Sequence, residues 1–325
     1  MSHKGVVMYF TRHTFLYVLL PVMLSACTPT NLAYITNQGD NTVSVIDTKQ
    51  QKVIDTITVG KSPVGIANAA DLHRVFVSNV EDQNVTVIDT NTNKVIHHIP
   101  VLGSPVGIAA SPDNQTLYVA DWYSNRILAI DPITYTIKQK VIVEKAPAGI
   151  IVSPDNQRLY IAARDSNEIV ILNTQDLSTQ QRIKVGKHPF GITLSIDGSM
   201  LYSVNVYDNT VSLINTNTWE QSILRVDDHP YCAVSSPDNQ TLYVTNTLDK
   251  SVSVIDIPSK KKIATIMVGE TPEGIDYDAE NDLVYIANWG ENNVTVINAN
   301  TNKVINTIPV GDKPRAFGQF ILHKK

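Results

Sequence analysis

The sequence predicts an all-β protein, a seven-bladed β-propeller with four antiparallel strands per blade. The main observation is a repeat, in which an aromatic residue opens a short strand-like segment at intervals of 42, 42, 42, 42, 41 and 42 residues. The aromatic positions are Tyr34, Phe76, Tyr118, Tyr160, Tyr202, Tyr243 and Tyr285. A period this regular indicates a repeat architecture, in which each unit buries its apolar face against the next.

Each repeat contains four short strands separated by turn sequences. In the last complete copy we expect strands at 274–277, 283–288, 293–298 and 303–308, because these runs are rich in Val, Ile, Thr and Tyr. Ser-Pro-Asp-Asn, a sequence suited to tight turns, recurs at 111–114, 153–156 and 236–239. Four strands in roughly 40 residues is the pattern of a propeller blade, whereas a leucine-rich or β-helix solenoid has shorter periods.

The repeats also carry motifs of a known family. Tyr-Val-Thr-Asn at 243–246, Asn-Thr-Val-Ser-Val-Ile-Asp at 41–47 and the connection Val-Gly-x-x-Pro-x-Gly-Ile resemble the YVTN-repeat β-propellers, which include YncE-like periplasmic proteins. The resemblance covers residues 32–322 and all seven repeats. It implies the fold, and it also implies single-stranded DNA binding as one alternative function.

The order of the strands predicts how the ring closes. The first repeat begins with its second strand, near Tyr34, and no first strand precedes it. The missing strand is expected at the other end of the chain, in Arg315–Leu322, which follows the seventh repeat proline. The C-terminal segment should therefore complete the N-terminal blade, so that no sheet edge stays open between the termini.

The first 31 residues differ from the repeats. Lys4 and Arg12 precede an apolar run that is too short to span a bilayer and that ends in Leu-Ser-Ala-Cys at 24–27. This tetrad resembles a bacterial lipobox. We therefore expect a lipoprotein signal peptide at 1–26, a lipidated Cys27 opening a short tether at 27–31, and the propeller at 32–325. The alternative is an ordinary signal peptide with an incidental cysteine.

This interpretation predicts a location and limits the classes of partner. The chain should sit in the bacterial cell envelope, on the periplasmic side of the outer membrane or at the cell surface, and contact the membrane through its lipid alone. Removing 1–26 changes the net charge from −5 to −7, because that segment holds two basic and no acidic residues. An acidic surface argues against broad binding to nucleic-acid backbones. We expect a monomer.

Seven prolines mark the starts of the inner strands, and the residue two positions later is small in all repeats but one. Inner strands converge on the central channel, where small residues allow close approach. The exception is Cys232, which has no disulfide partner if Cys27 is lipidated. We interpret Cys232 either as a small apolar filler or as a reactive or ligand-facing thiol. The prolines are Pro63, Pro105, Pro147, Pro189, Pro230, Pro272 and Pro314.

The connections around these prolines share one rim with the loops after each Tyr-Val-Thr-Asn position, and here the repeats diverge. Because function in such folds lies on loops, we predict that this rim binds a protein or a small-molecule ligand. The predicted contact residues are Trp122, Arg164, Tyr207, His229, Tyr231, Glu273, Trp289 and Arg315. Ordinary variation between surface loops is the alternative.

Motifs for catalysis and metal binding do not occur in the sequence. It has no Cys-x-x-Cys or His-x-x-x-His spacing, no Gly-x-Ser-x-Gly elbow and no phosphate-binding glycine loop, so we expect no catalytic residue, metal or cofactor. A hydrolase or lyase, as in seven-bladed lactonases, stays an alternative. It would draw on His188, His229, Glu273 and Asp165 as acid–base groups. For single-stranded DNA, the aromatic residues available to stack on bases are Trp122, Tyr123, Tyr207 and Trp289.

Overall fold

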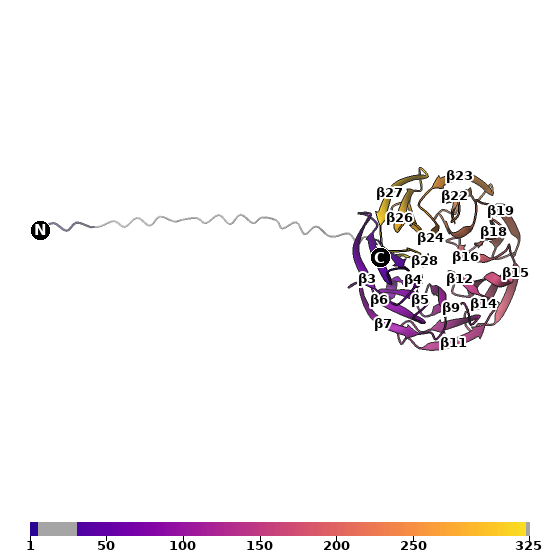
Figure 1. Ribbon diagram of the computed structural model, residues 1–325. Helices are drawn as coiled ribbons and strands as arrows, with labels where there is room; N and C mark the ends of the chain where they lie inside the picture. Colours follow the sequence, from indigo (N-terminus) through magenta and orange to yellow (C-terminus); the bar gives the residue numbers. More distant parts are fainter. Residues whose placement is uncertain (6–30, 323–325) are drawn as a thin grey trace.

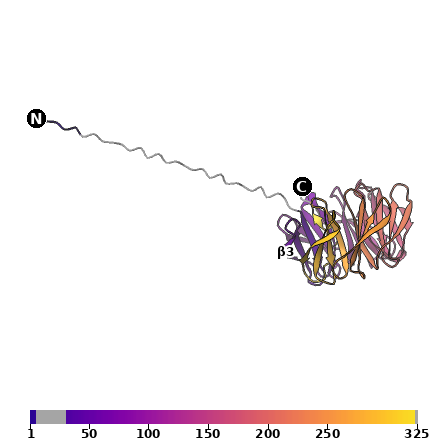
Figure 2. The ribbon, with the colours of Figure 1, turned by 90° about the horizontal axis from the view of Figure 1, so that it is seen from above.

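The computed structural model describes residues 1–5 and 31–322 of the chain. Residues 31–322 form a ring of seven β-sheets around a central channel, as Figure 1 shows along the axis and Figure 2 from the side. The predicted seven-bladed propeller is therefore confirmed. Cys27, most of the predicted signal peptide and the tether before Asn31 lie outside the described residues, so the lipoprotein interpretation stays a prediction.

The blades are numbered in chain order. Blade 1 contains β1 (Leu32–Asn37), β2 (Thr42–Asp47), β3 (Lys52–Thr58) and β29 (Ile321–Leu322). Blade 2 contains β4 (Pro63–Ala69), β5 (Arg74–Asn79), β6 (Asn84–Asp89), β7 (Lys94–Pro100) and the added β28 (Phe317–Gly318). Blade 3 contains β8 (Pro105–Ala110), β9 (Leu117–Asp121), β10 (Arg126–Ile130) and β11 (Ile137–Ile142).

The other four blades have four strands each. Blade 4 contains β12 (Pro147–Val152), β13 (Arg158–Ala163), β14 (Glu168–Asn173) and β15 (Thr179–Lys184). Blade 5 contains β16 (Pro189–Leu194), β17 (Met200–Asn205), β18 (Thr210–Asn215) and β19 (Gln221–Arg225). Blade 6 contains β20 (Pro230–Ser235), β21 (Thr241–Asn246), β22 (Ser251–Asp256) and β23 (Lys261–Met267). Blade 7 contains β24 (Pro272–Asp278), β25 (Leu283–Asn288), β26 (Asn293–Asn298) and β27 (Lys303–Pro309).

Helical structure in the described residues is limited to two 3₁₀ turns, η1 (Ala70–Leu72) and η2 (Arg164–Ser166). Within residues 1–5 and 31–322, no helix has the length and apolar character needed to cross a bilayer.

The repeated aromatic residue packs each blade against its neighbour. All seven rings are buried. In several repeats the tyrosine hydroxyl also reaches a turn of another blade, whereas Phe76 has no hydroxyl and that of Tyr202 has no hydrogen-bond partner among the described residues. Tyr118 Oη donates to the backbone oxygen of Thr174 at 3.3 Å, from blade 3 to blade 4. Tyr285 Oη donates to the backbone oxygen of Thr48 at 3.0 Å, which links blade 7 to blade 1. The 42-residue period therefore repeats an interblade contact.

The asparagine that ends the Tyr-Val-Thr-Asn motif has a structural role as well. Asn246 Nδ2 donates to the hydroxyls of Ser251 and Ser253, at 3.1 and 3.0 Å, on the neighbouring strand. Asn37 makes the same two bonds in blade 1. A buried amide that is hydrogen-bonded across two strands fixes their register. The motif therefore identifies the fold, while it carries no ligand-binding group of its own.

Small residues after the repeat prolines let neighbouring inner strands touch. A Cβ added to Gly107 would lie 1.9 Å from the backbone oxygen of Ala148 in the next blade, and one on Gly274 would lie 2.2 Å from that of Arg315. Backbone atoms cannot move aside as a flexible side chain does, so larger residues are excluded here. The expectation that inner strands approach closely at these positions is confirmed.

The predicted ring closure is confirmed, with one addition. β29 pairs with β1 in antiparallel register, Leu32 opposite Leu322 and Ala33 opposite Ile321, and Pro314 bridges to Asn37. The closing segment is two residues longer than an ordinary inner strand. Pro314 to Leu322 is eight residue steps, whereas Pro272 to Asp278 in blade 7 is six. The paired stretches of the neighbouring strands, β1 and β25, are both five steps long. The two extra residues bulge toward the channel as β28, which pairs in parallel with β4. Figure 1 shows β28 beside β4 near the axis.

Candidate functional site

The channel has two ends with different side chains. We call the end formed by the residues after the repeat prolines and the loops after the Tyr-Val-Thr-Asn positions the Pro rim. The opposite end, around Pro112, Pro154 and Ile196, is the Ser-Pro mouth. Inner strands run from the Pro rim to the Ser-Pro mouth, because each begins at its repeat proline. The predicted contact residues all belong to the Pro rim.

At the Pro rim, aromatic rings from several blades meet across the channel. The ring of Phe190 lies 4.3 Å from that of Tyr231 and 4.9 Å from that of Phe317, measured between centroids. Phe317 belongs to the extra β28 segment, and both phenylalanines are buried in one apolar cluster with Val64 and Ala148. These side chains close the channel at this end.

An ion pair lies beside these rings. Arg315 Nε donates to Glu273 Oε2 at 2.6 Å, and Arg315 Nη2 donates to the hydroxyl of Tyr231 at 2.7 Å. Burial raises the pKa of Glu273, and the Arg315 cation opposes that rise. Burial alone would lower the pKa of Arg315, but Tyr231 and Glu273 outweigh it and raise that pKa. Arg315 is therefore a fixed cation, held by two neighbouring blades.

Above this buried layer lies an exposed aromatic cluster, formed by Trp122, Arg164, His188, Tyr207 and His229. The guanidinium carbon of Arg164 is 5.5 Å from the ring centre of Trp122 and 5.8 Å from that of Tyr207, distances at which a cation is attracted to an aromatic face. The His188 ring stacks on Tyr207 at 4.2 Å, and His229 lies 5.4 Å from it. Tyr207 is 54% exposed and the other four side chains are half-buried, so the cluster reaches solvent mainly through Tyr207.

Two electrostatic features define this exposed cluster. Burial lowers the pKa of His188, and the nearby Arg164 lowers it further, so the imidazole is neutral at neutral pH. Arg164 also pairs with Asp165 at 2.6 Å. The cluster therefore offers one partly neutralised cation between two flat rings, a composition typical of protein-binding surfaces.

Trp289 contributes from the side of blade 7. Its Nε1 donates to Gln38 Oε1 at 3.2 Å, and the same oxygen accepts from Arg315 at 3.3 Å. Lys313 lies over the Trp289 ring at 5.3 Å. Gln38 therefore connects blade 1 to the ion pair.

The structure thus divides the predicted contact residues into two layers. Trp122, Arg164, Tyr207 and His229 lie in the exposed cluster, while Tyr231, Glu273 and Arg315 form the layer beneath it, with Trp289 attached through Gln38. Whether these residues bind a ligand or partner stays a prediction. A carboxylate at only 7% exposure, such as Glu273, supports the surface rather than contacting solvent.

The four acid–base candidates for a hydrolase or lyase, His188, His229, Glu273 and Asp165, each contact other side chains of the Pro rim. Glu273 pairs with Arg315, and Asp165 pairs with Arg164. His188 stacks on Tyr207, and His229 contacts the same ring at a tilt. Across residues 1–5 and 31–322, no group of three or more His, Cys, Asp or Glu side chains is arranged to hold a metal ion. Cys232 is buried, and burial raises the pKa of its thiol, which fits the apolar-filler interpretation.

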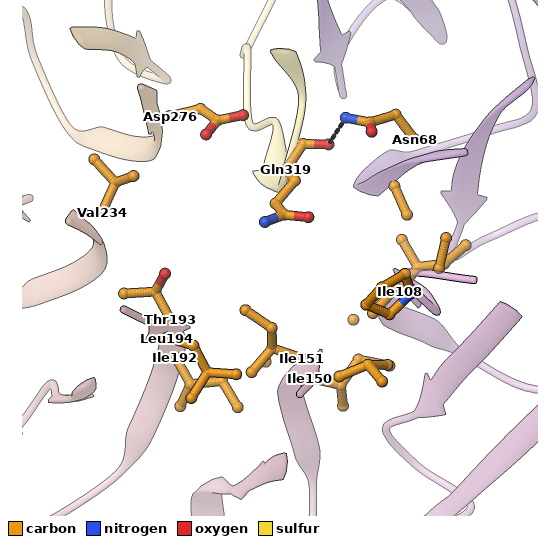
Figure 3. A pocket seen from close by; sticks show the side chains of 18 of the residues that line it. Asn68, Ile108, Ile150, Ile151, Ile192, Thr193, Leu194, Val234, Asp276 and Gln319 are labelled. Atoms are coloured by element: carbon orange, nitrogen blue, oxygen red, sulfur yellow. Dashed lines mark hydrogen bonds between the residues drawn. The ribbon is translucent and has the colours of Figure 1, made fainter. Parts of the chain in front are cut away.

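The Ser-Pro mouth opens into a pocket that the sequence analysis did not find. Its volume is about 470 Å³, and its walls come from inner strands around the ring. Figure 3 shows Ile151, Thr193, Val234 and Asp276 around its circumference, with Gln319 projecting into its centre. The position four residues after each repeat proline could have indicated it, since that position is charged in blade 7 alone. The residues there are Ala67, Ala109, Ile151, Thr193, Val234, Asp276 and Gly318.

Comparisons with solved structures agree with this architecture. A functionally unknown protein from Desulfotomaculum acetoxidans DSM 771 superposes with a TM-score of 0.76 at 17% identity, covering 89% of this chain and 100% of that one. Hydrazine synthase from Kuenenia stuttgartiensis gives 0.75 at 22% identity over 82% and 91% of the two chains. A candidate 6-phosphogluconolactonase from Bacteroides uniformis ATCC 8492 gives 0.75 at 13% identity over 88% and 98%. Such identities show a shared fold alone.

The sequence comparisons are more specific. No curated protein sequence matches the chain. The family model described as YNCE-like beta-propeller matches residues 67–223, which lie within the repeats. The resemblance indicated by the Tyr-Val-Thr-Asn motifs is therefore confirmed, and this chain is similar to the YNCE-like β-propellers over those residues.

Proposed function

We propose that this chain is a lipid-anchored binding module of the cell envelope, and that the exposed aromatic cluster on its Pro rim holds a partner protein. The observation that supports it most is the position of Arg164 between the rings of Trp122 and Tyr207. Trp, Tyr and Arg supply most of the binding energy at protein interfaces. Tyr123, which follows Trp122 in the chain, is 79% exposed.

The buried layer beneath supports this role. Tyr231 and Arg315 hold the loops of blades 6 and 1 together through a 2.7 Å hydrogen bond, while Phe190 fills the space below Trp122. A rim whose rings are already fixed loses little conformational freedom on binding. The Pro rim is thus a preorganised surface.

Site-specific photo-crosslinking tests the proposal. A photoreactive phenylalanine analogue at Tyr207 of the full chain, expressed in its own cells, should give a discrete crosslinked protein. The same photoreactive analogue placed at Ile263 on β23 is the matched control, because the two positions are similarly exposed, Ile263 at 57% and Tyr207 at 54%. The adduct should disappear in the Arg164→Ala background. With the captured partner purified, Arg164→Ala should weaken binding by about 2 kcal/mol or more, roughly 30-fold.

Other outcomes would count against a protein-binding rim. Identical adducts at Tyr207 and Ile263, or adducts that persist in Arg164→Ala, would show that contact is unspecific. Binding of single-stranded oligothymidylate that is lost on Tyr123→Ala and Tyr207→Ala would instead assign the rim to nucleic acid, where exposed rings stack on bases.

A further inference from the structure

The pocket at the Ser-Pro mouth is closed at its inner end by the closing segment of the ring. Phe317 contacts Phe190 across the channel, and the Phe317–Gly318 segment pairs with Gly65 and Ile66 of β4. Gly318 has φ of +127°, and a Cβ there would lie 2.3 Å from the backbone oxygen of Ile66. The two extra residues of this segment therefore convert an open channel into a pocket with one mouth.

Gln319 follows directly and enters the pocket. Its backbone oxygen accepts from Asn68 Nδ2 at 3.2 Å, and Figure 3 shows its side-chain amide in the middle of the cavity. Asp276 lies on the same side of the pocket. Its Oδ2 accepts from the backbone N–H groups of Phe320 and Ile321, both at 2.8 Å. The carboxylate is therefore held in place at the wall.

The opposite side of the pocket is aliphatic. Ile151 lies there, at the position equivalent to Asp276, and Figure 3 shows Ile150 and Ile192 near it and Ile108 farther round the ring. Val234, also at an equivalent position, lies next to Asp276. The lining residues include two carboxylates, Asp71 and Asp276, and no lysine, arginine or histidine. One wall is thus polar and negatively charged, and the other is apolar.

We propose that this pocket binds a small amphipathic cation, an aliphatic amine whose hydrocarbon part lies against the isoleucines and whose ammonium group lies between Gln319 and Asp276. The volume of about 470 Å³ is within the range of small-molecule sites. An ammonium group gains Coulombic attraction from the carboxylates, whereas a carboxylate or phosphate meets like charge. This site is separate from the Pro rim and does not depend on the partner proposed there.

Matched six-carbon probes test the proposal by calorimetry and by ligand-observed NMR at neutral pH. n-Hexylamine should bind at least about tenfold more tightly than n-hexanoate, because the two have similar chains but head groups of opposite charge. Ile151→Trp, which places a large ring in the pocket, should abolish amine binding. Tyr207→Ala on the Pro rim should leave it unchanged.

Loss of the charge preference is the sharpest test. Gln319→Lys puts a cation beside Asp276 in the centre of the pocket and should remove most of the preference for hexylamine over hexanoate. Gln157→Lys is its control, since it adds the same charge at an exposed position on the same face. Equal affinity for the two probes, no binding of hexylamine, amine binding that survives Ile151→Trp, or loss of the preference in Gln157→Lys would each overturn the site.

Discussion

The two ends of the channel are built from the same seven inner strands, yet they differ in what fills them. At the Pro rim, side chains from blades 5, 6 and 7 and from the closing segment meet and exclude solvent. At the Ser-Pro mouth the equivalent strands leave a cavity with an aspartate on one wall. The repeat symmetry therefore sets the positions of the strands. Substitutions in individual blades determine whether side chains fill the central channel or leave it open.

The closing segment contributes to both ends. Phe317 and Arg315 take part in closing the Pro rim, whereas Gln319 enters the pocket at the mouth. The chain can bulge here because two residues are added where six other inner strands have none, and the left-handed backbone at Gly318 admits the bend. This short strand is thus one source of the asymmetry of the ring, together with the substitutions in blades 5, 6 and 7.

Removal of the closing segment should have the largest effect. Deletion of 315–322 exposes the edge of β1 and removes Phe317, Phe320, Ile321 and Leu322, each at most 5% exposed. Burial of such a side chain contributes about 1.5–3 kcal/mol, against a total stability of roughly 5–15 kcal/mol. We expect unfolding or aggregation, measured by circular dichroism and size-exclusion chromatography. A chain truncated after Leu322 is the control, and a soluble deletion variant that melts within a few degrees of it would contradict the closure.

Breaking the buried ion pair should have an intermediate effect that is confined to the Pro rim. Arg315→Met leaves Glu273 buried without its cation. Removing one partner of a buried ion pair lowers the free energy of unfolding by about 3–5 kcal/mol. The double variant Arg315→Met/Glu273→Gln should recover part of that loss. Urea unfolding measures both.

A surface pair of the same geometry provides the comparison. Arg182 and Glu144 also lie 2.6 Å apart, but their side chains are 52% and 30% exposed. Arg182→Met should therefore change stability only slightly, because solvent screens exposed pairs. Equal losses for Arg182→Met and Arg315→Met would show that the Pro-rim pair does not stabilise the closed end.

The smallest expected effect is a difference in distance from the membrane between the two ends of the channel. The labelled variants should be as stable as the parent protein. Asn31 lies at the Ser-Pro mouth, where its Nδ2 donates to Asp278 at the end of β24. From Cys27 to Leu32 the extended chain spans at most about 17–18 Å. Spin labels on Gln157→Cys at the mouth and Asp165→Cys at the rim, in a Cys232→Ala background, should report the mouth closer to a membrane-bound quencher.

That orientation depends on the predicted lipid. In Cys27→Ser the protein should leave the membrane fraction and the two labels should be quenched alike. Stronger quenching at Asp165 in the anchored protein would place the Pro rim against the membrane, which is the reverse of what a module that catches partners in the aqueous space requires.

The number of blades, the strand order and the closure of the ring could be predicted from the amino-acid sequence alone. These follow from local chemistry that recurs in most copies: a buried aromatic ring against the next blade, an asparagine bonded across two strands, and a glycine where two backbones touch. Each of these has one physical role, so the copies that keep it indicate the same local geometry. The divergent residues of the Pro rim could be placed together for the same reason, because their repeat positions share one end of the axis.

Which of those residues face solvent, and where the central channel contains a pocket, could be seen only in the folded ring. Tyr231, Glu273 and Arg315 occupy equivalent positions in three successive repeats, and nothing in a single repeat shows that their side chains bond to one another. The pocket likewise depends on Asp276 of blade 7 meeting Gln319 of the closing segment and the isoleucines of other blades. The physical reason is that side chains on the axis contact residues from distant repeats, so their burial is set by the closed ring rather than by any local pattern.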